Sequence, residues 1–342
     1  MAGSAWRDIL VAWSRVRVLL VGDFLLDRWI YGTIDRISRE APVFIVEHET
    51  EAWGLGGAAN TAAQLRAFGA EVWAVGWLGE DADGERLLHM LQERGVRTDG
   101  MVWLGERSTV VKTRIVAGPP YAVKQQVLRL DRGRSAADVA GYADRSLRSF
   151  SAILPTADIV LVSDYGYGAG QPDMVAAMVR MARSAGVPLI GDSRYSLPAF
   201  RGADALTPNE SELAAVTGHS WRDAEGLFPV AREFCQRMEL AALLVTRGSQ
   251  GMALYERDVG RWTVIPVHGS PVPVDVAGAG DTVLATFGLA YAVTRDFQTA
   301  AYLANVAAGI VVMKKGVAQA TLEELRQALE VQGRSDEVTN RE

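Results

Sequence analysis

The sequence predicts an α/β protein whose mostly parallel central sheet is covered by helices on both faces. Short apolar runs that each end in a polar residue indicate buried parallel strands, and helical stretches lie between several of them. Such alternation builds right-handed βαβ units, whose ligands bind beyond the carboxyl ends of the strands. The runs are VRVLLVGD, DIVLVSD, VPLIGD, ADALTPN and ALLVT, which end at Asp23, Asp164, Asp192, Asn209 and Thr246. Helices are predicted at 172–186 and about 224–239.

Two segments without intervening helices, at about 28–48 and 107–131, predict a small antiparallel sheet. A sheet of this size cannot bury both faces alone, so it should cover a cleft, pair with a second subunit, or do both. Its alternating apolar residues, among them Val110, Ile115 and Val127, predict a homodimer built through this sheet. Residues 1–331 are expected to form one domain, and the polar residues 332–342 a flexible tail.

Composition excludes several classes of protein. The chain has 342 residues, of which 49% are hydrophobic and 22% are charged, and this composition is typical of a globular protein. Its net charge of −6 argues against nucleic-acid and anionic-membrane partners, and no apolar run is long enough to cross a bilayer. Cys235 is predicted to be a core side chain. The four histidines lack metal-ligand spacing, so no zinc site is predicted. The single cysteine and the lack of a membrane-spanning run lead us to expect a cytoplasmic location.

The stretch DVAGAGDT, residues 275–282, carries an aspartate on each side of a glycine turn that leads into a helix from Thr282. Paired glycines before a helix expose N–H groups that attract anions. Asp281 is either the N-cap of that helix or a general base that takes the proton of an attacking hydroxyl. In the second case, the neighbouring N–H groups stabilise charge on a transferring phosphoryl group.

Three other motifs allow two interpretations each. GLGGAAN at 54–60 fits a loose dinucleotide fingerprint, which keeps an oxidoreductase as an alternative, although it lies some thirty residues after the first strand. The sequence contains no Gly-Lys pair, which excludes a Walker A loop. TRGSQG at 246–251 is a hairpin turn or a nucleotide contact. Asn209 and Glu212 either cap a helix or hold hydrated magnesium.

GGAAN, TPNESE, TRGSQG and GAGDT, in this order and spacing, resemble the motifs of ribokinase-like (PfkB-type) carbohydrate kinases from Val18 to about Leu329. The resemblance implies a three-layer α/β/α fold with an antiparallel β lid, and binding of ATP, Mg²⁺ and K⁺. It makes Asp281 the catalytic base, the backbone of Ala279, Gly280 and Asp281 the anion hole for the γ-phosphate, and Gly278 a further catalytic position of the same turn. The sugar-binding positions implied are Asp23, Gly56, Gly57, Asn60, Asp164 and Asp275. The implied ATP-site positions are Asn209, Glu212, Thr246, Gly248, Gly251 and Asn305, of which Asn209 and Glu212 bind Mg²⁺ through water.

Within this family the chain is most similar to the heptose-7-phosphate kinases, through LLVGDFLLDRWIYG, RISREAPV, VVKTRIV, QVLRLD and LVSDYGYG. That similarity implies transfer of the ATP γ-phosphate to the anomeric hydroxyl of heptose 7-phosphate. The sequence departs from the family pattern at Ala277 in place of threonine, Tyr167 in place of lysine, and Arg194 within DSR in place of the lysine of DPK. Another sugar or nucleoside kinase, or a silent binding protein, remains an alternative.

Cations are concentrated in the predicted small sheet of this acidic protein. Lys112 and Arg114 alternate to one face of a strand, and Arg129 can join them from a neighbouring strand. Such a cluster suits a phosphate carried by the sugar, whereas the simpler alternative is that these cations, like Arg36, face water.

Overall fold

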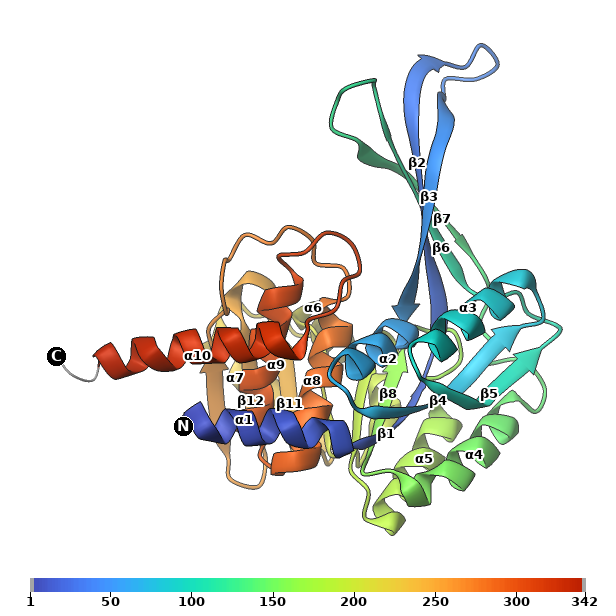
Figure 1. The fold of residues 1–342 in the computed structure, drawn as a ribbon. Helices are drawn as coiled ribbons and strands as arrows, with labels where there is room; N and C mark the ends of the chain where they lie inside the picture. The colour runs from blue at the N-terminus through green and yellow to red at the C-terminus, as the bar shows by residue number, and fades with distance from the viewer. Residues whose placement is uncertain (1–2, 340–342) are drawn as a thin grey trace.

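The computed structural model describes residues 3–339 and contains two sheets (Figure 1). The larger sheet has nine strands in the order β13-β12-β11-β10-β9-β8-β1-β4-β5. Its strands are β1 (Arg17–Gly22), β4 (Glu71–Gly79), β5 (Arg97–Leu104), β8 (Ile159–Asp164), β9 (Leu189–Ser193), β10 (Ala205–Leu206), β11 (Ala242–Thr246), β12 (Met252–Glu256) and β13 (Arg261–Ile265). Only β12 pairs antiparallel, with β11 and with β13, among the described strands of this sheet. The mostly parallel sheet is therefore confirmed, and every apolar run named above is one of its strands.

Helices cover both faces of this sheet, because its strands are apolar on both sides. Along β1, Val18 and Leu20 join one hydrophobic core, and Leu19 and Val21 join the other. The first core packs against α1 (Gly3–Ala12), α2 (Ala58–Ala67), α3 (Ala82–Glu93), α8 (Ala279–Thr294), α9 (Phe297–Val311) and α10 (Leu322–Thr339). The second packs against α4 (Tyr142–Ile153), α5 (Pro172–Ala185), α6 (Glu210–Thr217) and α7 (Ala224–Arg237), and it contains Cys235 as predicted. The fold is thus the expected three-layer α/β/α arrangement.

Local signals set the ends of several elements. Helix α5 starts with Pro172, whose missing N–H costs nothing there, and ends at Gly186 with φ of 68°. The predicted hairpin at 246–251 joins the antiparallel strands β11 and β12 through the short 3₁₀ helix η4 (Gly248–Gln250). The other 3₁₀ helices are η1 (Trp13–Arg15), η2 (Leu154–Thr156) and η3 (Leu197–Phe200).

The smaller sheet, called the lid sheet here, projects from the body in Figure 1 and has the order β3-β2-β6-β7. Its strands are β2 (Phe24–Ile37), β3 (Phe44–Gly57), β6 (Val111–Gly118) and β7 (Gln125–Arg132). The two hairpins, β2–β3 and β6–β7, are antiparallel as predicted, and the β2–β6 pair that joins them is parallel. The first hairpin extends beyond the predicted 28–48 at both ends, so that it begins directly after Asp23 and ends directly before α2.

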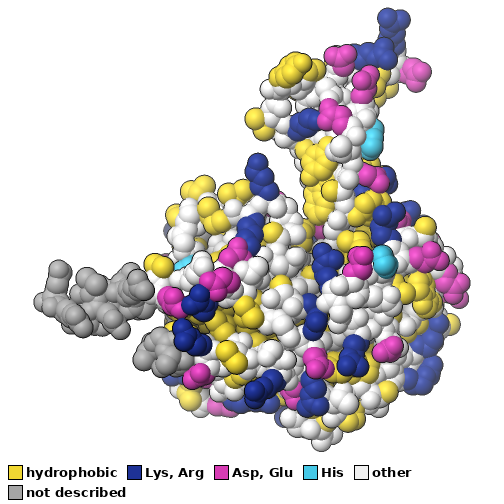
Figure 2. All heavy atoms as spheres, in the orientation of Figure 1, with side chains coloured by type: hydrophobic (Ala, Val, Ile, Leu, Met, Phe, Trp, Pro, Cys, Tyr) yellow, Lys and Arg dark blue, Asp and Glu magenta, His cyan; other side chains and the backbone are white. Residues whose placement is uncertain are grey.

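The lid sheet leaves large apolar side chains exposed. Phe44, Leu128 and Leu130 are 59%, 55% and 61% exposed, and hydrophobic side chains are visible along the projecting sheet in Figure 2. Val127 is 38% exposed, whereas Val110 is buried in the core, which corrects its assignment to an exposed face. The sheet therefore keeps an apolar surface that the rest of the described chain does not cover.

The predicted tail divides into two parts. Residues 332–339 continue helix α10 instead of leaving it, and residues 340–342 lie outside the described residues. Flexibility of this segment stays a prediction. Across the described part of the chain, no helix is long and apolar enough to cross a membrane.

Candidate active site

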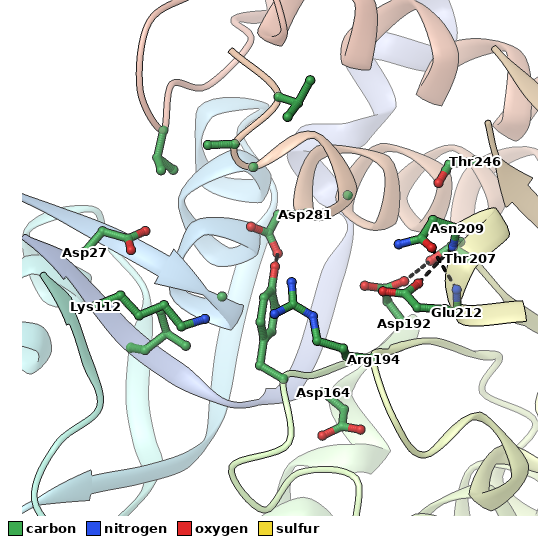
Figure 3. A pocket seen from close by; sticks show the side chains of 18 of the residues that line it. Asp27, Lys112, Asp164, Asp192, Arg194, Thr207, Asn209, Glu212, Thr246 and Asp281 are labelled. Carbon is green, nitrogen blue, oxygen red and sulfur yellow. Dashed lines mark hydrogen bonds between the residues drawn. The ribbon is translucent and has the colours of Figure 1, made fainter. Parts of the chain in front are cut away.

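A cavity of about 410 Å³ lies at the carboxyl ends of the parallel strands (Figure 3). Asp164, Asp192 and Thr246 reach it from β8, β9 and β11, as expected for an open α/β sheet. From the lid sheet come Asp27, Lys112, Arg114 and Arg129, and from the start of α8 come its N-cap Gly278 and the first-turn residues Gly280 and Asp281. The lid sheet and the core thus enclose one polar site between them.

A second cavity of about 370 Å³ adjoins the first and is lined mostly by apolar residues, among them Met252, Val283 and Val312. It also contains the predicted nucleotide-site residues Gly248, Gly251 and Asn305, together with Ala279. The side-chain amide of Asn305 donates to the carbonyl of Pro266 at 2.7 Å, which fixes its orientation. The two cavities share Thr246, Val276 and Gly280, so a ligand in one can reach a ligand in the other.

Asp281 lies in the first turn of α8, whose N-cap is Gly278, so the N-cap alternative for Asp281 is wrong. The helix begins three residues earlier than predicted because Gly278 adopts a φ of 80°, which favours glycine. The Asp281 carboxylate is 4% exposed and accepts hydrogen bonds from Asn60 Nδ2, Thr61 Oγ1 and the Tyr165 hydroxyl at 2.8, 3.2 and 2.9 Å. Burial raises the pKa of Asp281 to about 6, against the opposing effect of these hydrogen bonds.

This pKa predicts the pH dependence of any reaction in which Asp281 accepts a proton. Below about pH 6 the carboxyl group is protonated and cannot act as a base, so kcat/KM should rise as the pH increases through about 6 and level off above it. Initial rates between pH 5 and 8 measure this. A rate that falls across the same range would contradict the assignment of Asp281 as the base.

The turn before α8 has the features of an anion site. No side chain caps this helix, and the first N–H groups of a helix lack intrahelical partners. A Cβ at Gly278 would approach Asn60 Nδ2 to 2.7 Å, so the turn packs closely against α2. Gly280 lines both cavities, and a Cβ there would meet no atom within 4 Å, so the space beside its backbone is open to a ligand.

Asn209 and Glu212 form a capping box at the start of α6. Asn209 Oδ1 accepts from the Glu212 N–H, and Glu212 Oε2 accepts from the Asn209 N–H, both at 2.9 Å. Both residues also line the cavity, next to Asp192 and Thr207 (Figure 3). Burial, followed by the nearby charge of Glu212, raises the pKa of Asp192 to about 8. Burial likewise raises the pKa of Glu212, and it outweighs the opposing effects of the hydrogen bond from Asn209 and of the Arg194 charge.

The three predicted lid cations all line the polar cavity, and the register places Arg114 opposite Arg129. Arg114 is paired with Asp27, and Arg129 forms a two-point ion pair with Asp131. Lys112 is 6% exposed and makes no hydrogen bond or ion pair with any described residue. Its ammonium lies 4.8 Å from the centre of the Tyr165 ring, and burial lowers its pKa. Lys112 is therefore the cation of this group that most needs an anionic ligand.

Four of the predicted sugar-binding residues line neither cavity. Asp23 is 1% exposed, and its carboxylate accepts the N–H groups of the loop at 165–169, so it supports that loop and does not face the cavity. Asn60 binds Asp281, and Asp275 accepts the N–H groups of Ala277 and Gly316. Gly56 packs against Asp27, whose carboxylate a Cβ there would meet at 2.7 Å. These residues lie behind the cavity wall, where they support the residues and loops that form it.

Several cavity residues were given no role in the site by the sequence interpretation, among them Asp27, Tyr165, Thr207 and Arg194. Asp27 lines the cavity, where Asp23 was predicted to bind the sugar, because β2 brings Asp27 to the cavity wall. The motif GDFLLD offers both aspartates, and only the direction of β2 tells which one faces inward. Asp192 is one of the polar strand ends that were expected near the ligand, and Tyr165 directly follows another of them, Asp164.

The chain belongs to the pfkB family of carbohydrate kinases, whose family model matches residues 18–325. It is 38% identical over 325 residues to the bifunctional protein HldE of Magnetococcus marinus, covering 93% of this chain and 65% of that protein. It is 40% identical over 324 residues to the protein of the same name from Methylococcus capsulatus, covering 94% and 65%. The chain therefore spans slightly less than two thirds of the length of these relatives.

Solved structures share the fold. The ribokinase of Arabidopsis thaliana complexed with ribose and ATP superposes with a TM-score of 0.71 at 21% identity, over 92% of this chain and 99% of that one. Phosphofructokinase-2 of Escherichia coli in complex with potassium gives a TM-score of 0.73 at 16% identity, with the same coverage. The ribokinase-like fold predicted from the sequence is confirmed.

Proposed function

We propose that the protein is an ATP-dependent carbohydrate kinase that phosphorylates a sugar hydroxyl. The observation that carries this proposal is the position of Asp281, which lies beside Gly280 where the polar and the apolar cavity join. The sugar hydroxyl gives its proton to Asp281 as its oxygen bonds to the γ-phosphorus, and the bond from that phosphorus to the bridging oxygen of ADP breaks. The N–H groups at the start of α8 stabilise the negative charge on the transferring phosphoryl group.

Support for ATP in the second cavity comes from its apolar lining and from its glycines at the η4 turn. The related fold of ribokinase has been solved with ribose and ATP, which favours the same division of the two cavities here. The alternative of a dinucleotide-dependent oxidoreductase has no support, because Gly54, Gly56 and Gly57 end the lid strand β3 and do not follow β1.

The oxygen-rich group of Asp192, Glu212, Asn209 and Thr207 fits a hydrated Mg²⁺ ion. Its two carboxyl groups have raised pKa values, which a divalent cation would reverse by favouring the charged forms. When bound with ATP, Mg²⁺ neutralises phosphate charge during transfer.

K⁺ activation stays a prediction. It is supported by Asp275, which ties the turn before α8 to the loop at 314–320, and a comparison of rates in K⁺ and in a bulky organic cation tests it.

The acceptor that the site fits best is a sugar that already carries a phosphate, and heptose 7-phosphate is the leading candidate. Lys112 is a buried cation without an anionic partner, on the lid side of the cavity and away from the nucleotide residues. A phosphate remote from the reacting hydroxyl would satisfy it. The sequence similarity to heptose-7-phosphate kinases points to the same acceptor, and another pfkB-type sugar or nucleoside kinase is the alternative.

Release of ADP across matched sugars and sugar phosphates tests this function. A sugar phosphate, with heptose 7-phosphate the best of the panel, should react with a higher kcat/KM than its unphosphorylated counterpart. Equal efficiency for unphosphorylated sugars would move the assignment to the broader class of sugar kinases. Absence of ADP release with every acceptor would overturn the kinase itself.

A homodimer through the lid sheet is also proposed, because the sheet carries apolar side chains such as Phe44, Leu128 and Leu130 that the rest of the described chain leaves exposed. Sedimentation at micromolar concentration should give twice the mass of the chain. Leu130→Lys should shift the protein toward the monomer, whereas Val259→Lys, at a turn remote from this sheet, should not. A monomer for the unchanged protein would contradict the proposal.

A further inference from the structure

The Tyr165 hydroxyl donates a hydrogen bond to Asp281, the proposed base, from the side of the polar cavity. Asp281 Oδ1 accepts two hydrogen bonds, from Thr61 and from Tyr165, and Oδ2 accepts one from Asn60. A carboxylate oxygen has two lone pairs, so Oδ1 is fully used. Of the three donors only Tyr165 lines the polar cavity, from which the acceptor must approach. The Tyr165 hydroxyl therefore occupies the Oδ1 acceptor position of Asp281 from the cavity side, where an attacking hydroxyl would donate its proton to this oxygen.

Hydrogen bonds to Asp23 fix the backbone around Tyr165. The buried carboxylate of Asp23 accepts the N–H groups of Tyr165 and Tyr167 at 2.8 Å and that of Ala169 at 2.9 Å. Gly166 and Gly168 adopt φ angles of 85° and 130°, which let the loop wrap around that carboxylate. Asp23 thus contributes to the site indirectly, by fixing the loop that presents the phenol.

Two cations hold the Tyr165 ring. Lys112 Nζ lies 4.8 Å from the ring centre and Arg194 Cζ lies 5.1 Å from it. Both side chains line the same cavity and make no ion pair with any described residue. Figure 3 shows Arg194 between Asp281 and the group around Asn209 and Glu212. Because anionic groups of the substrates would compete for both cations, the ring is held most strongly when the cavity contains no substrate.

We propose that Tyr165 is a removable cap on the base, which keeps water from the position of the acceptor until a sugar displaces the phenol. This inference rests on the proposed kinase function. Without the cap, a water oxygen bonds to the γ-phosphorus, its proton passes to Asp281, and the bond to the bridging oxygen of ADP breaks. The products are ADP and inorganic phosphate, so the cap prevents wasteful hydrolysis of ATP.

Release of inorganic phosphate from ATP in the absence of any acceptor tests the cap. Tyr165→Phe keeps the ring and its two cations but removes the hydroxyl, so acceptor-independent hydrolysis should rise about 10-fold, a modest part of the effect of a general base. Transfer to a saturating acceptor should change much less, because the acceptor displaces the phenol in either protein. Tyr167→Phe is the matched control, since the Tyr167 ring also lies near Lys112, at 5.8 Å, but its hydroxyl has no contact with Asp281.

The double variant Tyr165→Phe with Asp281→Asn should lose the added hydrolysis, which ties that activity to this base. Unchanged hydrolysis in Tyr165→Phe, or equal increases in Tyr165→Phe and Tyr167→Phe, would overturn the cap. A Tyr165→Phe variant that loses transfer without gaining hydrolysis would show that the phenol only supports Asp281. Raised hydrolysis by Tyr165→Phe, combined with no transfer by the unchanged protein to any sugar, would keep the cap on the base and refute the proposed sugar-kinase function.

Discussion

Asp281→Asn is expected to lower turnover at least ~100-fold while leaving the affinity for ATP nearly unchanged, because a general base contributes roughly 10²–10⁴-fold to such reactions. The amide cannot take the proton of the acceptor. The hydroxyls of Thr61 and Tyr165 can accept hydrogen bonds as well as donate them, so the side chain keeps its partners and the fold is retained. Steady-state rates with a binding titration of ATP measure both parts.

The control for this variant is Asp258→Asn, which removes an exposed carboxylate at the turn between β12 and β13. It should behave as the unchanged protein does. Thermal unfolding of both variants establishes that they are folded. Turnover of Asp281→Asn within a few-fold of the unchanged protein would refute the role of Asp281.

Lys112→Ala is expected to raise the KM for a phosphorylated acceptor about 10- to 100-fold, since hydrogen bonds to charged groups contribute roughly 1.5–3 kcal/mol. The KM for ATP should stay the same, because Lys112 does not line the nucleotide cavity. Burial lowers the pKa of Lys112, and the substitution breaks no ion pair of the described chain, so thermal unfolding should show that the variant is folded. Acceptor titrations at saturating ATP measure the effect.

Arg36→Ala is the matched control, because Arg36 is an exposed cation of the same sheet and does not line the cavity. A second comparison uses an unphosphorylated sugar, whose KM should respond little to the loss of Lys112. If Lys112→Ala and Arg36→Ala have the same small effect, the lid cations are ordinary surface charges and the acceptor need not carry a phosphate.

The layers and the general position of the site were predictable, because each apolar run and each glycine turn acts locally. The five runs ending at polar residues became parallel strands, and the carboxyl ends of several form the cavity wall. The glycine turn at 278–280 stands at the start of a helix as expected. These features depend on short stretches of sequence and on rules of sheet topology.

Side-chain partners were harder to predict, because they depend on contacts between distant segments. Asp23 and Asp27 look equivalent in GDFLLD, yet one supports a loop 142 residues away and the other lines the cavity. Arg114 and Arg129 cannot be distinguished from Lys112 by sequence, but Asp27 and Asp131 neutralise them and leave Lys112 unpaired. The parallel pairing of β2 with β6 likewise has no local signal, since it joins two hairpins that are far apart in the sequence.

The strands β2 and β3 connect the tip of the lid sheet to the site, because β2 begins and β3 ends beside the cavity. At that end Phe24 pairs with Gly57 and Leu25 with Gly56, so a single ladder joins the residue after Asp23 to the residue before α2, the helix that carries Asn60. The strands continue to Phe44 near the tip, with register shifts between Tyr31 and Gly32 and between Ile34 and Arg36. From Phe24 to Tyr31 the pairing keeps one register, so a tilt of this part of the sheet would move the backbone beside the supports of both Tyr165 and Asp281. If a partner subunit binds the apolar tip, its binding and the binding of a ligand in the distant cavity would be coupled through these two strands.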